Sequence, residues 1–207
     1  MSQAKELTLG IAQLGLSVAP EAQQKLLQYL ELLYKWNRVY NLTAIRQPEQ
    51  MVSGHLLDSL AVVPHMWPGC WLDVGCGAGL PGLVLAMACP QWTFTLIDSN
   101  SKKTSFVQQA KMELELNNVS VHCGRVESWQ AGVKFDGIIS RAFTNTAGFV
   151  GLTRHLLAQR GGWIAMKAAP KAAELEQLPH DVSVIGVVPL EVPGVVAARC
   201  LIMLKPT

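Results

Sequence analysis

The most constraining feature of this chain is a glycine-rich segment, Leu72-Asp73-Val74-Gly75-Cys76-Gly77-Ala78-Gly79-Leu80-Pro81-Gly82, that separates two apolar runs. Glycine adopts positive φ without strain and lets a ligand approach the backbone closely. In an open α/β sheet, ligands bind at the carboxyl ends of the strands, where a loop of this kind lies. The segment therefore predicts a buried strand, a ligand-binding turn and a helix, in that order.

The glycines fit two binding patterns. Gly77-x-Gly79-x-x-Gly82 matches the dinucleotide fingerprint, but this register starts late after the strand and contains a proline. The other register, Asp73-x-Gly75-x-Gly77-x-Gly79, places an acid before the first glycine. An acid there repels a pyrophosphate and suits a ligand with an amino group, such as the methionine end of S-adenosylmethionine. The second register is favoured, and a nicotinamide-dependent oxidoreductase is the alternative.

Short apolar runs alternate with amphipathic segments from residue 68 onward, which predicts an α/β fold with a mostly parallel sheet. Gly161-Gly162 is interpreted as the cap that ends the helix before the fifth strand. The tail predicts a closing antiparallel hairpin joined through Pro193-Gly194. The predicted strands are Cys70–Gly75, Thr93–Asp98, Val119–Cys123, Phe135–Ser140, Trp163–Lys167, Val182–Val188 and Ala197–Leu204.

Composition narrows the class of protein. Half of the 207 residues are apolar, yet the longest apolar run, Leu83 to Cys89, is far shorter than the roughly 20 residues of a membrane span. Strands buried on both faces explain the apolar content. The formal net charge of +2 neither demands nor excludes a nucleic-acid partner. Five cysteines without ligand-like spacing predict free thiols, a cytoplasmic location and no metal site.

The first third of the chain is predicted to be helical. Pro20 suits a first helical turn, and Leu26, Leu30, Leu33 and Asn37 follow one face at helical spacing. A second helix is expected from Pro48. We therefore expect residues 1–67 to form a helical N-terminal extension packed on the core of a cofactor-binding domain, residues 68–207. His55 and Asp58, three residues apart, are interpreted as a pair buried between the two parts.

Charged side chains follow the ends of three predicted strands. Asp98 can accept both ribose hydroxyls of a nucleoside, although an acid there can also cap the next helix. Val126 and Glu127 could flank an adenine ring, although an acid there can equally complement the dipole at the start of a helix. Arg141 follows the fourth strand, at the position that faces the reaction centre in this fold, where a guanidinium can hold a carboxylate or phosphate bidentately. The alternative is a partly exposed arginine in a salt bridge.

Five motifs, in their order and spacing, resemble those of one family, the glucose-inhibited division protein B family, also called ribosomal RNA small subunit methyltransferase G. They are Lys35-Trp36-Asn37-x-x-Tyr40-Asn41-Leu42-Thr43, His55-Leu56-Leu57-Asp58-Ser59, the glycine segment, Asp98-Ser99 and Ser140-Arg141-Ala142. One departure is Lys167-Ala168, where the family often has Lys-Gly.

The resemblance implies the class I S-adenosylmethionine-dependent methyltransferase (Rossmann-like) fold, with seven strands. It implies methylation of guanine N7 at position 527, in the 530 loop of 16S rRNA, either in naked rRNA or in the 30S subunit. It implies cofactor contacts at Gly75, Leu80, Val126, Glu127 and Arg141, besides those that the residues themselves predict at Asp73, Gly77, Gly79 and Asp98.

Guanine N7 carries an exposed lone pair, so no general base is needed. Arg141 is the expected catalytic residue, in contact with the cofactor carboxylate, a phosphate or guanine O6 and not with N7. A monomer is expected, and a cofactor- or RNA-binding regulator without turnover is a further alternative. The expected RNA contacts are Lys35, Asn37, Arg38, Tyr40, Asn41, Arg46, Lys102, Lys103, Phe143, which could stack on the base, and Lys167.

Overall fold

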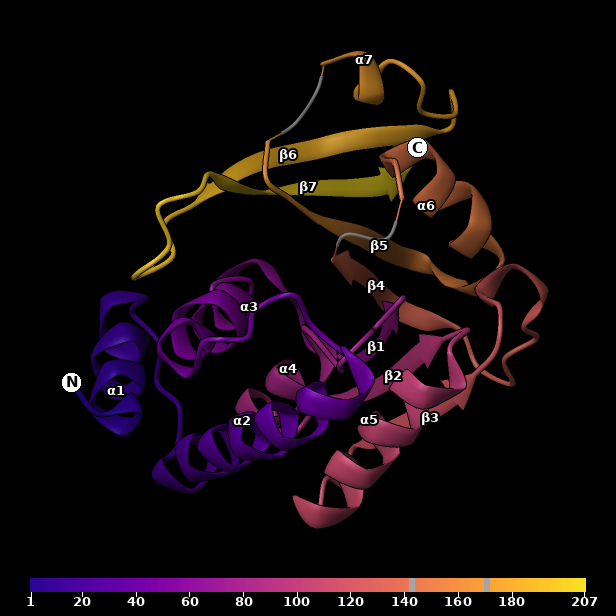
Figure 1. Ribbon diagram of the computed structural model, residues 1–207. Helices are drawn as coiled ribbons and strands as arrows, with labels where there is room; N and C mark the ends of the chain where they lie inside the picture. Colours follow the sequence, from indigo (N-terminus) through magenta and orange to yellow (C-terminus); the bar gives the residue numbers. More distant parts are fainter. Residues whose placement is uncertain (142–143, 170–171) are drawn as a thin grey trace.

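A twisted seven-stranded sheet forms the centre of the molecule (Figure 1). The structure is a computed structural model that describes residues 1–141, 144–169 and 172–207. The strand order is β3-β2-β1-β4-β5-β7-β6. The first five strands pair in parallel, and β7 runs antiparallel to both of its neighbours. The strands are β1 (Cys70–Val74), β2 (Thr93–Asp98), β3 (Val119–Cys123), β4 (Phe135–Arg141), β5 (Leu157–Lys167), β6 (Val182–Leu190) and β7 (Arg199–Pro206). The predicted sheet, with its antiparallel C-terminal hairpin, is confirmed, and β6 forms the edge of the sheet.

Helices precede the sheet and connect its strands. Pro20 begins α2 as predicted, whereas Pro48 begins only a single 3-10 turn that leads into a π-helix. The α-helices are α1 (Gln3–Gln13), α2 (Pro20–Tyr40), α3 (Asp58–Leu60), α4 (Gly82–Ala88), α5 (Ser101–Glu113), α6 (Thr146–Thr153) and α7 (Ala172–Leu175). The π-helix spans Val52–Leu57, and 3-10 turns lie at Pro48–Gln50, Val63–His65, Val126–Ser128 and Arg154–Leu156.

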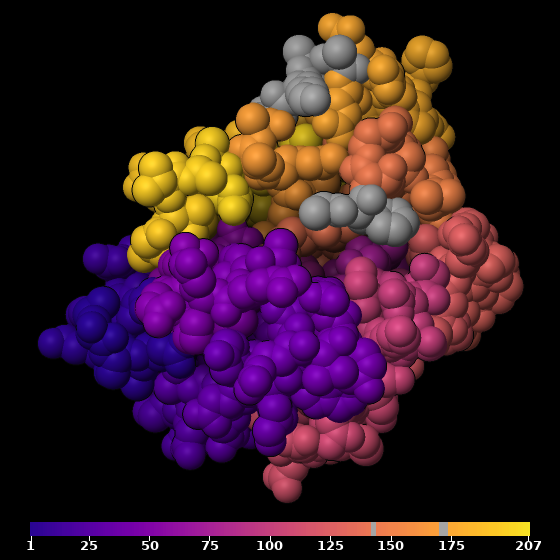
Figure 2. Space-filling view, viewed as in Figure 1, coloured from indigo at the N-terminus to yellow at the C-terminus, as the bar shows by residue number. Residues whose placement is uncertain are grey.

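The sheet separates two apolar clusters, because successive side chains of a strand point to opposite faces. Trp71 of β1 packs on one face with the residues of α2, α4 and α5, and Leu72 packs on the other with those of α6. The N-terminal segment has no core of its own, since its buried residues belong to the first cluster. In Figure 2 the C-terminal hairpin, in yellow, meets the purple N-terminal segment.

Tyr29 connects the N-terminal segment to the glycine segment. Its side chain is fully buried and its hydroxyl donates a hydrogen bond of 2.8 Å to the carbonyl oxygen of Ala78. Burial raises the pKa of this phenol far above its usual range, so the hydroxyl keeps its proton and remains a donor. Helix α2 therefore fixes the backbone of the loop that follows β1.

The interpretation of Gly161-Gly162 as a helix cap is wrong. Helix α6 ends at Thr153, and β5 begins at Leu157, so both glycines lie inside a strand. A Cβ on Gly161 would lie 2.9 Å from the carbonyl oxygen of Asp136, and one on Gly162 would lie 2.9 Å from that of Leu204. The glycines are needed because the backbones of the neighbouring strands approach closely, a use of glycine that differs from capping.

Within residues 1–141, 144–169 and 172–207, no helix has the length and apolar character needed to cross a membrane. In the same ranges no three His, Cys, Asp or Glu side chains gather closely enough to hold a metal ion. All five cysteines are unpaired, as predicted.

Candidate functional site

The loop after β1 has the backbone that the glycine pattern predicts. Gly75, Gly77 and Gly79 have φ of 66°, 55° and 83°, a region that side chains with a Cβ rarely adopt. The amides of Gly75 and Cys76 both donate to the carbonyl oxygen of Ile97, at 2.9 and 3.1 Å. The loop is therefore held against the end of β2, with its glycines lying at the carboxyl edge of the sheet.

Asp73 lies beneath this loop and is fully buried. One carboxylate oxygen, Oδ2, accepts a 2.8 Å hydrogen bond from the amide of Gly82 at the start of α4. The other, Oδ1, has no hydrogen-bond partner among the described residues. Burial raises the pKa of Asp73 to about 7, although the Gly82 amide and the charge of Arg141 oppose the rise. Asp73 thus stabilises the loop and retains one unused acceptor.

A cavity of about 340 Å³, here called the first cavity, lies beside the loop at the ends of β1, β2 and β3. It brings together four residues predicted to bind a cofactor: Gly75, Asp98, Val126 and Glu127. Gly77, Gly79 and Leu80 belong to the adjoining loop and do not line it. Lys103, expected at an RNA surface, lines this cavity instead, with its ammonium 4.0 Å from Asp98.

Asp98 connects the glycine loop with the segment after β2. Its Oδ2 accepts from the amide of Gly77 at 3.0 Å and its Oδ1 from the amide of Asn100 at 2.9 Å. The alternative that Asp98 caps the next helix is wrong, because the side chain of Asn100 caps α5. Each carboxylate oxygen has a second lone pair, so Asp98 can still accept hydrogen bonds from a ligand in the first cavity.

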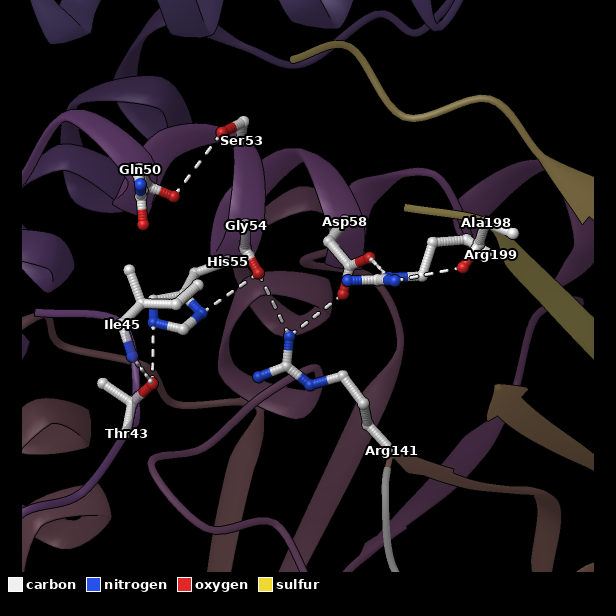
Figure 3. Close-up of polar contacts among 10 residues, drawn as sticks. All are labelled: Thr43, Ile45, Gln50, Ser53, Gly54, His55, Asp58, Arg141, Ala198 and Arg199. Carbon is white, nitrogen blue, oxygen red and sulfur yellow. Dashed lines mark hydrogen bonds and ion pairs between the residues drawn. The ribbon is translucent and has the colours of Figure 1, made fainter. Parts of the chain in front are cut away.

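A second cavity of about 440 Å³ lies at the ends of β4 and β5 and the start of β7, with the N-terminal segment as its other wall. At its centre is Asp58, which is only 2% exposed. Arg141 donates through Nη1 to Oδ2 of Asp58 at 3.0 Å and to the carbonyl oxygen of Gly54 at 3.4 Å. Arg199 donates through Nε to Oδ1 of Asp58 at 2.9 Å (Figure 3). One carboxylate thus holds guanidinium groups from two strands.

His55 and Asp58 are both buried, as predicted, but each has other hydrogen-bond partners. His55 Nε2 lies 3.1 Å from Oγ1 of Thr43, and its Nδ1 lies 3.1 Å from the carbonyl oxygen of Gly54 (Figure 3). Burial, together with the charge of Arg141, lowers the pKa of His55 to about 4. His55 is therefore neutral at pH 7. The sequence reasoning missed Arg199 and the partners of Asp58, since those contacts join distant segments.

The residues expected to contact RNA have diverse surroundings. Asn37 departs from that expectation, because its side chain is buried, accepts from the amide of Thr43 at 2.9 Å and donates to the carbonyl of Ile45 at 3.4 Å. Lys167 donates to Glu174 at 2.7 Å and to the carbonyl of Thr144 at 2.8 Å, so its charge is matched within the chain. Both residues have structural partners that compete with an RNA contact.

The other expected contacts lie mainly at the surface. Tyr40 packs against Trp36 with ring centroids 5.3 Å apart and ring planes tilted by 34°. Asn41 ends α2 in the left-handed region and accepts from Arg46 at 2.8 Å. Lys35, Arg38, Tyr40, Asn41, Arg46 and Lys102 are exposed. Phe143 lies outside the described residues. A basic and aromatic surface therefore follows the end of α2 toward the second cavity, which Thr43 and Ile45 line.

The chain is similar in sequence to known proteins over nearly its whole length. A family model described as rRNA small subunit methyltransferase G matches residues 22–203. The protein of that name from Laribacter hongkongensis is 50% identical over 204 residues, with 99% of each chain covered. The one from Methylobacillus flagellatus is 51% identical over 200 residues, with 97% of each chain covered. These matches favour the methyltransferase interpretation over the nicotinamide-dependent alternative.

Solved structures identify the fold. The glycopeptide N-methyltransferase MtfA, solved in complex with S-adenosylmethionine, superposes with a TM-score of 0.62 at 10% identity, over 74% of this chain and 95% of that one. The fold is therefore that of the class I S-adenosylmethionine-dependent methyltransferases, as the resemblance implied. At this identity the similarity is one of fold, and the chemistry depends on the two cavities.

Proposed function

Because the chain belongs to the rRNA small subunit methyltransferase G family, we propose that it methylates N7 of guanine 527, in the 530 loop of 16S rRNA. Family membership makes the chain an S-adenosylmethionine-dependent rRNA methyltransferase. The observation that supports guanine N7 as the acceptor atom is the pairing of two cavities at one sheet edge, in the second of which His55 and Asp58 are already held by contacts within the chain.

The residues around the first cavity fit S-adenosylmethionine. Asp98 has free lone pairs for a ribose, and Glu127 lies beside the buried side chain of Val126, where an adenine can pack. The unpartnered Oδ1 of Asp73 offers an acceptor beneath the glycine loop, toward the amino end of the ligand. In this proposal the cofactor contacts are Asp73, Gly75, Gly77, Gly79, Leu80, Asp98, Val126, Glu127 and Arg141.

A general base is unnecessary for attack by guanine N7, since that atom carries a free lone pair and no proton. His55 could not serve as one in this arrangement, because both ring nitrogens already lie within hydrogen-bond distance of the chain. An adenine or cytosine amine would lose a proton during methylation. The second cavity therefore favours an acceptor atom that needs none.

The cofactor supplies a methyl group on a positively charged sulfur, and the protein supplies orientation. Arg141 is the proposed catalytic residue. Its Nη1 is engaged by Asp58 and Gly54, which holds the guanidinium in one direction and keeps this donor away from N7. A donor bonded to N7 would occupy the attacking lone pair. Alignment of the two reactants can lower the barrier by roughly 7–11 kcal/mol.

The test is to incubate 30S subunits that lack the modification, and separately their deproteinised 16S rRNA, with labelled S-adenosylmethionine. Mass spectrometry of nuclease fragments should find one 7-methylguanine, at position 527, in at least one substrate. Label on adenine or cytosine would refute the acceptor assignment. Absence of label from both substrates would favour a regulator that binds cofactor or RNA without turnover.

The proposal extends to the partners and location of the protein. Its substrate is 16S rRNA, naked or within the 30S subunit, and the enzyme acts as a cytoplasmic monomer. The RNA contacts are proposed at the exposed side chains of Lys35, Arg38, Tyr40, Asn41, Arg46 and Lys102, together with Phe143, which is inferred from sequence. Sedimentation velocity, measured with and without rRNA, distinguishes a monomer from a dimer.

A further inference from the structure

The second cavity lies at the same sheet edge as the first, although part of it comes from an antiparallel strand. Lys167, the last residue of β5, pairs with Cys200, near the start of β7. The start of β7 therefore lies level with the carboxyl ends of β4 and β5. This arrangement places Arg199 beside the edge on which cofactors bind in open α/β sheets.

The lining of the second cavity combines apolar walls with a few charges. Ile45 of the N-terminal segment, Met166 of β5 and Leu190 of β6 supply apolar surface from three directions. Arg141 and Arg199 supply the guanidinium groups. Pockets for small planar ligands are mainly apolar, with a small number of placed polar groups. The walls suit a purine base, and the guanidinium groups suit an anionic group attached to it.

The charges leave one positive charge uncompensated. Among the described residues that line the second cavity, Arg141, Arg199 and Lys167 are cationic and Asp58 is anionic. Lys167 is neutralised by Glu174 at 2.7 Å, and Asp58 neutralises one of the two arginines. A surplus of one charge matches one phosphodiester.

Arg199 is the arginine whose guanidinium retains a donor for a ligand. Its Nε binds Asp58 and its Nη1 donates to the carbonyl of Ala198 at 3.0 Å. Its Nη2 has no hydrogen-bond partner among the described residues. Its side chain is 29% exposed, so this donor is accessible while Asp58 restrains the base of the fork (Figure 3).

We propose that the second cavity is the acceptor-nucleotide site, in which the target purine nucleotide of the RNA packs its base against Ile45, Met166 and Leu190 and places one phosphodiester on Arg199. Asp58 is a positioning residue, because it holds Arg199 and Arg141 in fixed relative orientation from the N-terminal segment. This inference rests on the proposed function and names the place where its substrate binds.

The test compares four variants of the full-length protein. Arg199→Gln removes the proposed phosphate contact and Arg199→Lys keeps its charge. Ala168→Phe adds bulk at the exposed rim of the second cavity, where the structure has room for a larger side chain. Arg154→Gln is the matched control, because Arg154 is also paired with an aspartate, Asp181, but does not line either cavity.

Steady-state methylation of deproteinised 16S rRNA and calorimetry with S-adenosylhomocysteine are measured for each variant. Arg199→Gln and Ala168→Phe should lower kcat/KM at least 10-fold, chiefly by raising KM for RNA, while the Kd for S-adenosylhomocysteine stays within twofold. Arg199→Lys should recover part of the loss and Arg154→Gln should match the wild type. Guanosine 5′-monophosphate should compete with RNA for the wild type and compete less well for Arg199→Gln.

Two results would overturn the assignment. One is a kcat/KM within twofold of wild type for both Arg199→Gln and Ala168→Phe. The other is a parallel loss of S-adenosylhomocysteine affinity in Ala168→Phe, which would show that the cavity belongs to the cofactor. Ala168→Phe carries the test if Arg199→Gln fails to fold. Failure of the proposed function has a separate sign, since the wild type would then form no 7-methylguanine.

Discussion

The two cavities share one sheet edge but are built in different ways. The first is formed mainly by residues 74–127, in loops that follow three successive strands. The second joins the N-terminal segment, β4, β5 and the hairpin, with 141 positions of sequence between Asp58 and Arg199. Backbone amides and glycines shape the first, and charged side chains shape the second. Cofactor binding should therefore depend on local chain geometry, whereas acceptor binding should depend on the packing of distant segments.

The largest expected effect is that of Asp98→Ala on cofactor affinity at the first cavity. The substitution removes the proposed acceptor for two ribose hydroxyls and frees the amide of Gly77. Two hydrogen bonds to a charged group are worth about 4 kcal/mol together, which is a loss of roughly a thousandfold in affinity. Titration calorimetry with S-adenosylhomocysteine measures it. Asp181→Ala, at an exposed carboxylate, is the control, and equal affinity in the two variants would contradict the cofactor assignment.

The next effect is a dependence of stability on pH, and it concerns His55, which lines the second cavity. Because the pKa of His55 is lowered from 6.5 to about 4 in the folded protein, the unfolded chain binds more protons between these values. Its contribution to stability is full above pH 6.5 and is lost as the pH falls through 4, approaching about 3 kcal/mol. His55→Gln should flatten the fall in the free energy of unfolding across this range, as measured by urea titration. An unchanged slope in His55→Gln would refute the burial argument.

A smaller effect is expected for Asp58→Asn, which keeps the shape of the side chain but removes its charge. Arg141 and Arg199 then both lose their ionic partner at a nearly buried carboxylate, at a cost of about 2 kcal/mol in the free energy of unfolding. The RNA methylation rate should fall while S-adenosylhomocysteine affinity is retained. Loss of both in equal measure would mean that the two cavities are not separable. Asp181→Asn supplies the control for stability.

The smallest effect is expected for Lys35→Ala, at the exposed end of α2. One lost phosphate contact should weaken RNA binding by about 1 kcal/mol and reduce the slope of log affinity against log salt concentration by about one. Filter binding with 16S rRNA at several salt concentrations measures both quantities. Lys5→Ala, on α1, is the control. A salt slope equal to that of the wild type would remove Lys35 from the RNA surface.

Sequence reasoning succeeded where structure is determined locally. The strand that ends at Asp98 and the glycine loop after β1 have the expected limits, because apolar runs and positive-φ glycines are encoded by neighbouring residues. It failed for Gly161, whose role depends on the neighbouring strand β4. It also failed for Asp58, whose partners follow it by 83 and 141 positions. A charged residue at the start of an apolar antiparallel strand was the available signal for Arg199.

The link between Asp58 and Arg199 has a consequence for the timing of synthesis. Chains emerge from the ribosome at about 5–20 residues per second, and the residues of the first cavity emerge before those of the hairpin. A growing chain can therefore assemble its cofactor loops while residue 199 is still inside the ribosome. The acceptor half closes only when the last strand inserts between β5 and β6. The proposed acceptor site, unlike the cofactor loops, is thus incomplete until residue 199 has been synthesised and β7 has paired with β5.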